Sequence, residues 1–126
     1  MQLNPVFTDR APVPVGPYSQ AVSANGFLFI SGQLPINPLK NEMIEGDISE
    51  ATRQCLKNIK AILNASGAEL HHVVKVTVYT VKISKFAQIN EVYREFFHEP
   101  YPARAVVEVS ALPGKAQVEI EAVAAV

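Results

Sequence analysis

The chain has 126 residues, of which 48% are hydrophobic and 18% are charged, and its formal net charge is −1. This length suits one globular domain spanning residues 1–126, and the composition excludes a disordered chain. The small net charge gives no electrostatic reason to bind nucleic acid or an anionic membrane, and no apolar run approaches the ~20 residues of a membrane-spanning helix.

The first third of the chain predicts short strands separated by turns. Val6–Thr8 is expected to form a strand before a proline-rich loop. Residues 19–24 and 27–31 are expected to pair as a hairpin, because Asn25-Gly26 between them favours a tight two-residue turn. A loop with a short strand at Met43-Ile44 is expected to follow.

The first helix is expected to begin at Asp47, with Glu50 three residues later completing a capping box. Its apolar stripe continues through Leu63, and Gly67 is expected to end it. Cys55 is the only cysteine and lies on this stripe, which predicts a buried thiol acting as a small hydrophobic side chain. A single cysteine excludes an intrachain disulfide and a cysteine-based metal site.

Residues 73–81 are rich in β-branched side chains and predict a strand. Ser84 is expected to cap a second helix, whose apolar stripe runs from Phe86 to Phe96. The prolines that follow this stripe are expected to stop the helix. This pattern predicts a strand followed by a helix in the second half of the chain.

Two further strands are expected at the C-terminal end, on either side of Pro113-Gly114, because polar and apolar residues alternate there. We expect the two strands to pair as a hairpin around that turn. One face of each strand is apolar and suits a core. The other face is expected to carry Arg104 and Glu108 on the first strand and Glu119 and Glu121 on the second.

This hairpin would place Arg104 roughly opposite Val123, and Glu119 opposite Glu108. Arg104 and Glu119 would then share one face of the sheet but lie about 13 Å apart along the strands. A small substrate can hardly contact both side chains in one chain. We therefore expect a site completed across a subunit interface, with Arg104 and Glu119 supplied by different copies.

The order of these elements predicts an α/β (α+β) fold, in which a single mixed β-sheet has two helices packed on one face. The other face of the sheet is left without helices. On the strand at residues 73–81 one face carries Lys75, Thr77 and Tyr79. A sheet face of mixed polar and apolar character is better explained by assembly than by solvent exposure, so the sequence favours a symmetric oligomer.

A series of motifs extends in order over nearly the whole sequence. These motifs are Val15-Gly16-Pro17-Tyr18-Ser19-Gln20, Ser31-Gly32-Gln33-Leu34-Pro35, Val74–Tyr79, Phe86–Tyr93, Pro102-Ala103-Arg104 and Val118–Ala122. Together they resemble the motifs of the Rid family of reactive intermediate deaminases.

The resemblance implies a chorismate-mutase-like fold and a homotrimer with three clefts between subunits. It implies hydrolysis of 2-imino acids, or of enamine acids such as 2-aminoacrylate and 2-aminocrotonate, to 2-keto acids and ammonia. It also implies that no cofactor is used. The expected partners are therefore a small 2-imino or 2-keto acid and further copies of this chain.

Arg104 and Glu119 occupy the positions that the resemblance marks as catalytic. Arg104 matches the carboxylate-binding arginine, whose fork binds a carboxylate through two parallel hydrogen bonds, as a lysine cannot. A structural salt bridge to Glu108 or Glu121 is the alternative role. Glu119 matches the acidic residue that positions or activates the attacking water, and a solvated strand carboxylate is the alternative.

Five further positions match residues that line the substrate cleft of the family. At Val106 many family members have cysteine, so this chain excludes a thiol mechanism there, and the backbone is expected to make the contact. Gln33 and Lys75 are expected to be structural. The five substrate-binding positions are Tyr18, Ser31, Gly32, Asn90 and Val106.

A non-catalytic alternative remains: a trimeric sensor or chaperone-like protein that binds a small carboxylic acid through Arg104. A nuclease would need a basic surface, which a pI near 6.3 does not supply. The histidines, His71, His72 and His98, lack the spacing of a metal site. Since residues 1–10 lack the apolar region of a signal peptide, we expect a cytoplasmic protein, with a mitochondrial location left open.

Overall fold

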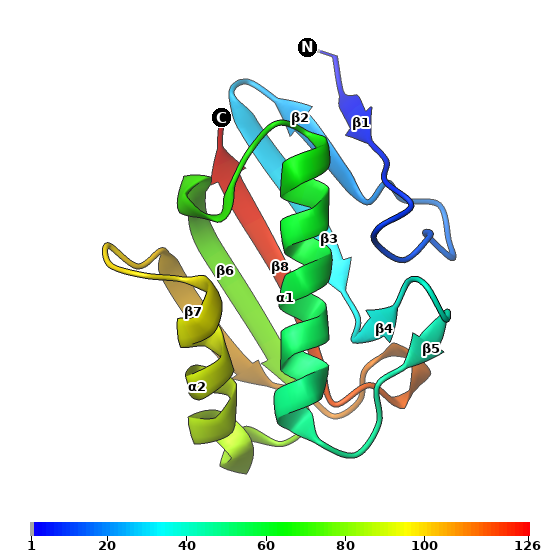
Figure 1. Cartoon of the computed structure of the whole chain (residues 1–126), viewed down its shortest axis with the longest axis vertical. Helices are drawn as coiled ribbons and strands as arrows, with labels where there is room; N and C mark the ends of the chain where they lie inside the picture. Colours follow the sequence, from blue (N-terminus) through cyan, green and yellow to red (C-terminus); the bar gives the residue numbers. More distant parts are fainter. Residues whose placement is uncertain (1) are drawn as a thin grey trace.

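The computed structural model describes residues 2–126, which form one mixed six-stranded sheet with both helices on one face (Figure 1). In spatial order, the strands of this sheet are β1 (Asn4–Val6), β2 (Ala21–Ala24), β3 (Phe27–Gln33), β8 (Val118–Ala125), β6 (Val73–Thr80) and β7 (Ala103–Glu108). The helices are α1 (Ile48–Ala65) and α2 (Phe86–Phe96). The predicted arrangement of sheet and helices is confirmed, with a small second sheet of β4 (Ile36–Asn37) and β5 (Glu42–Met43) added.

The predicted hairpin at Asn25-Gly26 is confirmed as the connection between β2 and β3. Asn25 has φ 52° and Gly26 has φ 81°, so both turn residues are left-handed, as a two-residue hairpin turn requires. The first strand lies earlier than predicted. Thr8 lies outside it because the buried Gln20 side chain accepts the Thr8 N–H at 2.8 Å and donates to the Thr8 carbonyl at 2.9 Å.

Local signals set both ends of α1. The Asp47 side chain accepts the Ser49 N–H at 2.9 Å and caps the helix as predicted, but Glu50 pairs with Arg53 rather than completing a capping box. At the other end Gly67 has φ 81°, and the N–H groups of Gly67 and the next residue return to carbonyls of the last turn. This is a Schellman motif, which confirms the glycine stop.

The core lies between the sheet and the two helices, and α1 supplies much of it. Cys55 is fully buried on the α1 stripe, as predicted, with its sulfur 3.8 Å from the Val118 carbonyl oxygen. Burial raises the pKa of the Cys55 thiol well above its ordinary value. A buried protonated thiol is unreactive, so Cys55 is a packing residue.

The prediction that Ser84 caps α2 is wrong. Ser84 lies inside a 3₁₀ turn, Ile83–Lys85, which leads directly into the helix, and Lys85 is the N-cap residue without a side-chain cap. The turn is held instead by the Ile83 N–H, which donates to the Glu108 carboxylate at 3.1 Å. Since this contact comes from β7, local sequence could not reveal it.

The predicted pairing of the last two strands is also wrong, because β6 lies between them. β6 pairs parallel with β7 and antiparallel with β8. The connection from β7 to β8 passes the end of β6, where the Val109 N–H donates to Thr80 and the Val81 N–H donates to Gln117. The segment at Pro113 forms a 3₁₀ turn within this wide connection, not a hairpin turn.

The inserted strand also changes which residues share a face. In the parallel pairing Arg104 lies beside Val76 and Glu108 beside Thr80, and both of these β6 residues are buried beneath the helices. Arg104 and Glu108 therefore lie on the helix-covered face, not on the open face as predicted. On β8 buried and half-buried residues alternate. Glu119 and Glu121 therefore lie on the open face, as predicted. Neither helix within residues 2–126 combines the length and hydropathy of a membrane span.

Candidate active site

Arg104 projects from β7 towards α2 and is held by three contacts. Its Nη1 donates to Asn90 Oδ1 at 2.9 Å. Its guanidinium carbon lies 4.7 Å from the ring centroid of Tyr93 and 5.6 Å from that of Phe86, within the range of cation–π attraction. The guanidinium is therefore fixed in position before any ligand arrives, which reduces the entropy lost on binding.

This guanidinium lines a cavity of about 310 Å³ between α2 and the segment that leads into β7. The residues around the cavity are Asn90, Tyr93, Arg94, Tyr101, Pro102 and Arg104. None of them is a carboxylate, and Arg104 forms no ion pair within residues 2–126. The alternative of a structural salt bridge is therefore not what the structure shows, and the cavity suits an anion.

Tyr93 belongs to this group although the sequence did not mark it as a site residue. It is buried, and its hydroxyl has no hydrogen-bond partner among the described residues. Burial raises the pKa of Tyr93 to about 12, and the positive charge of Arg104 acts in the opposite direction. An unpaired buried hydroxyl costs stability and is uncommon in native proteins, so its place beside Arg104 points to a functional neighbourhood.

Val106 lies two residues beyond Arg104 on the same face of β7 and packs against the hydrophobic core. Its side chain is half-buried, so valine suits this position by its apolar character. The expected substrate contact through the Val106 backbone remains a prediction. Asn90, Arg104 and Val106, together with Tyr93, form what we call the arginine half-site.

A second group surrounds Glu119 on the open face. A β-bulge between Ile30 and Gln33 interrupts the pairing of β3 with β8 and places Gly32 against the Glu119 side chain. A Cβ atom on Gly32 would lie 2.9 Å from Glu119 Cδ and would overlap Oε2. The absence of a side chain at Gly32 therefore allows the carboxylate to lie over the strand.

Ser31 connects this group to the loop that contains Tyr18. Its hydroxyl donates to the Ser19 carbonyl at 2.6 Å, and its N–H donates to the Gln20 carbonyl at 2.9 Å. Tyr18 stays 48% exposed beside these contacts. Tyr18, Ser31, Gly32 and Glu119 form what we call the glutamate half-site. Gln33 is buried and donates to the Ser31 carbonyl at 3.1 Å, which fits its predicted structural role.

Burial raises the pKa of Glu119, and the nearby charge of Glu121 raises it further. Glu121 has its own partner, because the Tyr79 hydroxyl donates to Glu121 Oε1 at 2.9 Å. This hydrogen bond raises the pKa of Tyr79 and fixes the position of Glu121. A carboxylate with a raised pKa holds a proton more readily, so Glu119 is suited to acid–base work.

The two half-sites are separate within one chain. The register places Arg104 level with Ala122 and Glu119 level with Val107, three residues further along β7. That offset is about 10 Å along the strands, and crossing two strand spacings adds about 10 Å sideways. The two side chains also lie on opposite faces of the sheet, so the prediction that they share a face is wrong. A small molecule cannot contact both in one chain.

A family model described as Endoribonuclease L-PSP matches residues 8–126. The chain belongs to this family. We call it the Rid family, because RutC and Rid proteins are among the relatives of the chain. A RutC family protein of Pyrococcus horikoshii is 56% identical over 119 residues, with 94% of each chain covered.

Other Rid-family relatives carry more specific names. A 2-iminobutanoate/2-iminopropanoate deaminase of Dermatophagoides farinae is 44% identical, and the match covers 94% of this chain and 92% of that protein. The crystal structure of RidA from the Antarctic bacterium Psychrobacter sp. PAMC 21119 superposes with a TM-score of 0.92 at 45% identity, covering 96% of this chain and 98% of that one. Among residues 2–126 no group of three or more His, Cys, Asp or Glu side chains could hold a metal ion.

Proposed function

We propose that this protein hydrolyses small 2-imino acids, and their enamine tautomers, to 2-keto acids and ammonia. The observation that carries the proposal is Arg104, held by Asn90 and Tyr93 in a cavity without a carboxylate. A guanidinium with free N–H groups in such a cavity binds a small carboxylate. The relatives named as 2-iminobutanoate/2-iminopropanoate deaminases support the choice of reaction.

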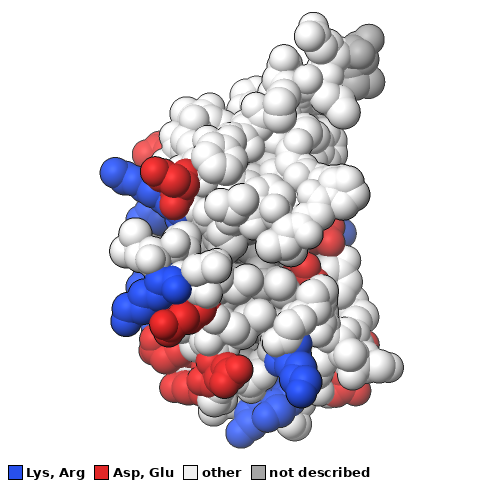
Figure 2. All heavy atoms as spheres, turned by 90° about the vertical axis from the view of Figure 1, so that its right-hand side faces the viewer, with Lys and Arg blue, Asp and Glu red and all other residues white. Residues whose placement is uncertain are grey.

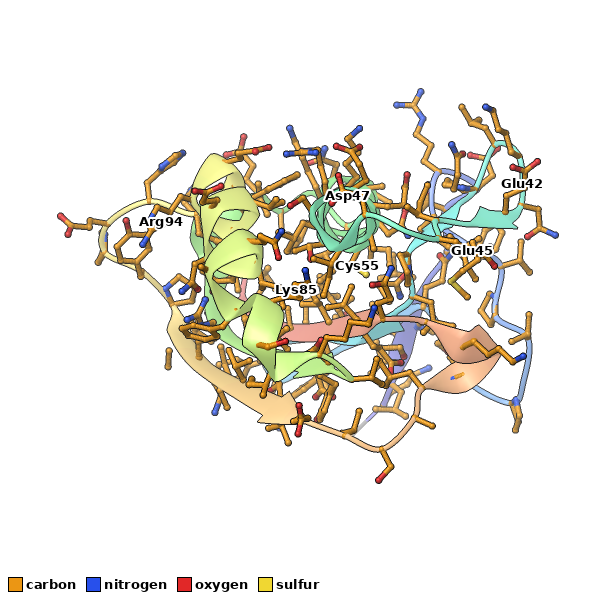
Figure 3. The ribbon with its side chains drawn as sticks, turned by 90° about the horizontal axis from the view of Figure 1, so that it is seen from below. Glu42, Glu45, Asp47, Cys55, Lys85 and Arg94 are labelled. Atoms are coloured by element: carbon orange, nitrogen blue, oxygen red, sulfur yellow. The ribbon has the colours of Figure 1, made fainter. Side chains whose placement is uncertain are left out.

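The working site in this proposal lies between copies of the chain, with the arginine half-site of one copy facing the glutamate half-site of the next. Their separation within one chain supports this arrangement. The open face of the sheet has no helix over it (Figure 3) and exposes large apolar side chains. Phe27, Phe29 and Val107 on that face are 41%, 45% and 41% exposed. We propose a homotrimer with a chorismate-mutase-like fold, as the family resemblance implies.

The reaction needs few groups in such a cleft. Arg104 binds the substrate carboxylate and thereby orients the adjacent C=N carbon. A water molecule held by Glu119 of the neighbouring copy adds to this carbon, which forms the C–O bond, and its proton passes by way of the carboxylate to the nitrogen. The new hydroxyl group then loses its proton, the nitrogen takes up a second proton by way of the same carboxylate, and the C–N bond breaks, which releases ammonia and leaves the keto group. Positioned acid–base help of this kind typically accelerates a reaction by about 10²–10⁴-fold.

The family model is described as an endoribonuclease, which makes RNA cleavage a second candidate activity. A nuclease of this kind is expected to have a basic surface. On the side of the molecule shown in Figure 2, acidic and basic side chains are intermingled, and the net charge of the chain is −1. This side of the molecule therefore offers no basic surface for nucleic acid.

The test is an assay in which a dehydratase that uses pyridoxal phosphate generates 2-aminoacrylate from serine in the presence of the protein. We expect faster release of pyruvate than without the protein, and no acceleration by Arg104→Ala. Light scattering of the same samples should show an oligomer in both cases. Binding of pyruvate without acceleration would contradict the enzyme proposal and support a carboxylate-binding sensor.

A further inference from the structure

The cavity that contains Arg104 has a second arginine in its wall. Arg94 lies one helical turn beyond Asn90 on α2, so both side chains point to the same side of the helix. Figure 3 shows Arg94 beside the segment that leads from α2 into β7. The cavity is thus lined by two arginines, and the reaction proposed above uses only one of them.

Arg94 is not neutralised by a carboxylate. It forms no ion pair within residues 2–126, and no acidic side chain lines the cavity. The adjacent Glu95 is engaged with Arg53 on α1, which donates to its two oxygens at 2.8 and 2.7 Å. Arg94 therefore presents an uncompensated positive charge at the same cavity as Arg104.

The position of Arg94 on α2 puts it within reach of a ligand that is bound to Arg104. Arg104 is tied to Asn90, and Arg94 lies four residues further along α2, which corresponds to about 6 Å along the helix axis. The two carboxyl carbons of an extended four- or five-carbon diacid are roughly 4–5 Å apart. A cavity of about 310 Å³ has room for such a molecule.

We propose that the preferred substrates are 2-imino acids with a second carboxylate, and that Arg94 is the residue that selects them. Arg104 binds the carboxylate next to the imine carbon and Arg94 binds the distal one. Such imines form when an oxidase removes two electrons from aspartate or glutamate. Water adds at the imine carbon, ammonia leaves, and the distal carboxylate is unchanged. This inference rests on the hydrolysis proposed above.

The experiment compares hydrolysis of a dicarboxylic imine with that of a monocarboxylic imine. L-glutamate oxidase generates 2-iminoglutarate, and a dehydratase acting on threonine generates 2-iminobutanoate by way of its enamine. Semicarbazide is present in both assays and traps the free imine as a semicarbazone. Hydrolysis by the protein is measured as the fall in semicarbazone formation. The variants are Arg94→Ala, Arg94→Lys and, as a matched control, Lys57→Ala, which removes an exposed positive charge from α1 outside this cavity.

We expect Arg94→Ala to raise KM for 2-iminoglutarate about tenfold with little change in kcat, because a charge-assisted contact to a non-reacting group is lost. KM for 2-iminobutanoate should stay unchanged in Arg94→Ala. Arg94→Lys should recover part of the loss, and Lys57→Ala should behave as the unaltered protein. Equal KM values for the two imines, or an unaltered KM in Arg94→Ala, would overturn the role of Arg94.

Product binding separates this inference from the proposed activity. By calorimetry, 2-oxoglutarate should bind more tightly than 2-oxobutanoate, and Arg94→Ala should remove the difference. If neither imine were hydrolysed but this binding preference depended on Arg94, the proposed reaction would be wrong while the dicarboxylate site would stand. If 2-iminobutanoate were hydrolysed and no binding preference existed, the reaction would stand and the dicarboxylate site would be wrong.

Discussion

Arg104 and Glu119 lie on opposite faces of one sheet, with β6 between the two strands that carry them. Arg104 reaches under α2 to Asn90, whereas Glu119 lies over the bulge of β3 on the open face. Arg104 is held by Asn90 and Tyr93, and the two side chains do not contact each other. This arrangement makes the proposed shared site a question of assembly rather than of side-chain motion.

Mixing two inactive variants tests that arrangement directly. Arg104→Ala and Glu119→Gln should each lose most of the imine hydrolysis, about 10²–10⁴-fold for Glu119→Gln. After the two variants are unfolded together and reassembled, about one quarter of the sites should combine an intact Arg104 with an intact Glu119 from the neighbouring copy. The measurement is keto-acid release by the mixture relative to each variant reassembled alone.

A mixture that remained as inactive as its components would show that both residues act within one copy, or that one of them is not needed as proposed. Arg104→Lys mixed with Glu119→Gln serves as a further comparison. It should recover the same share of activity, because the restored sites use the intact arginine of the Glu119→Gln copy.

Gly32→Ala should move the Glu119 carboxylate. The new Cβ would overlap Oε2 and lie 2.9 Å from Cδ, and only the flexible end of the glutamate side chain can give way. We therefore expect a fall in kcat with little loss of thermal stability. Gly16→Ala is the matched control, because a Cβ there meets Tyr18 ring atoms at an ordinary 3.6 Å. Unchanged turnover in Gly32→Ala would mean that the observed position of Glu119 is not required.

The ring and the hydroxyl of Tyr93 should have separable effects. Tyr93→Phe keeps the surface under the Arg104 guanidinium and removes a buried hydroxyl without a partner, so stability should be kept or rise by about 1 kcal/mol. Tyr93→Leu stays apolar but removes the cation–π contact, so carboxylate binding should weaken several-fold. Denaturant unfolding and calorimetry with 2-oxobutanoate measure the two effects. Loss of stability in Tyr93→Phe would reveal a partner for the hydroxyl in the assembled protein.

Much of the fold was predictable because its signals are local. The left-handed turn at Asn25-Gly26, the cap at Asp47 and the stop at Gly67 each depend on one or two residues. The burial of Cys55 follows from helical periodicity alone. By contrast, the place of β6 between β7 and β8 depends on long-range pairing, which adjacent residues do not encode.

The candidate site divides in the same way. A period of two indicates that Arg104 and Val106 share a face, but it does not indicate which face is covered when both faces mix polar and apolar residues. Ala103, Ala105 and Val107, on the other face of β7, are apolar and fitted the core as well as Val106 did. Tyr93 was predictable as a buried residue, whereas its unpaired hydroxyl and its contact with Arg104 exist only in three dimensions.

The raised pKa of Glu119 predicts how stability depends on pH. A carboxyl group whose pKa is higher in the folded state than in the unfolded state stabilises the fold below its unfolded pKa and loses that contribution as the pH rises through its folded pKa. Burial is the main cause of the raised pKa, and the charge of Glu121 adds to it. At neutral pH the ionised Glu119 therefore destabilises the fold.

Glu119→Gln should consequently unfold at a higher denaturant concentration than the unaltered protein at pH 7, while its catalytic loss remains. This advantage should shrink as the pH falls towards the ordinary pKa of a glutamate and disappear below it, because Glu119 is then protonated in both states. Glu91→Gln is the control, since Glu91 is an exposed carboxylate on α2 and should show no such gain. A Glu119→Gln protein that was less stable at pH 7 would mean that the carboxylate gains a cationic or hydrogen-bonding partner in the assembled protein.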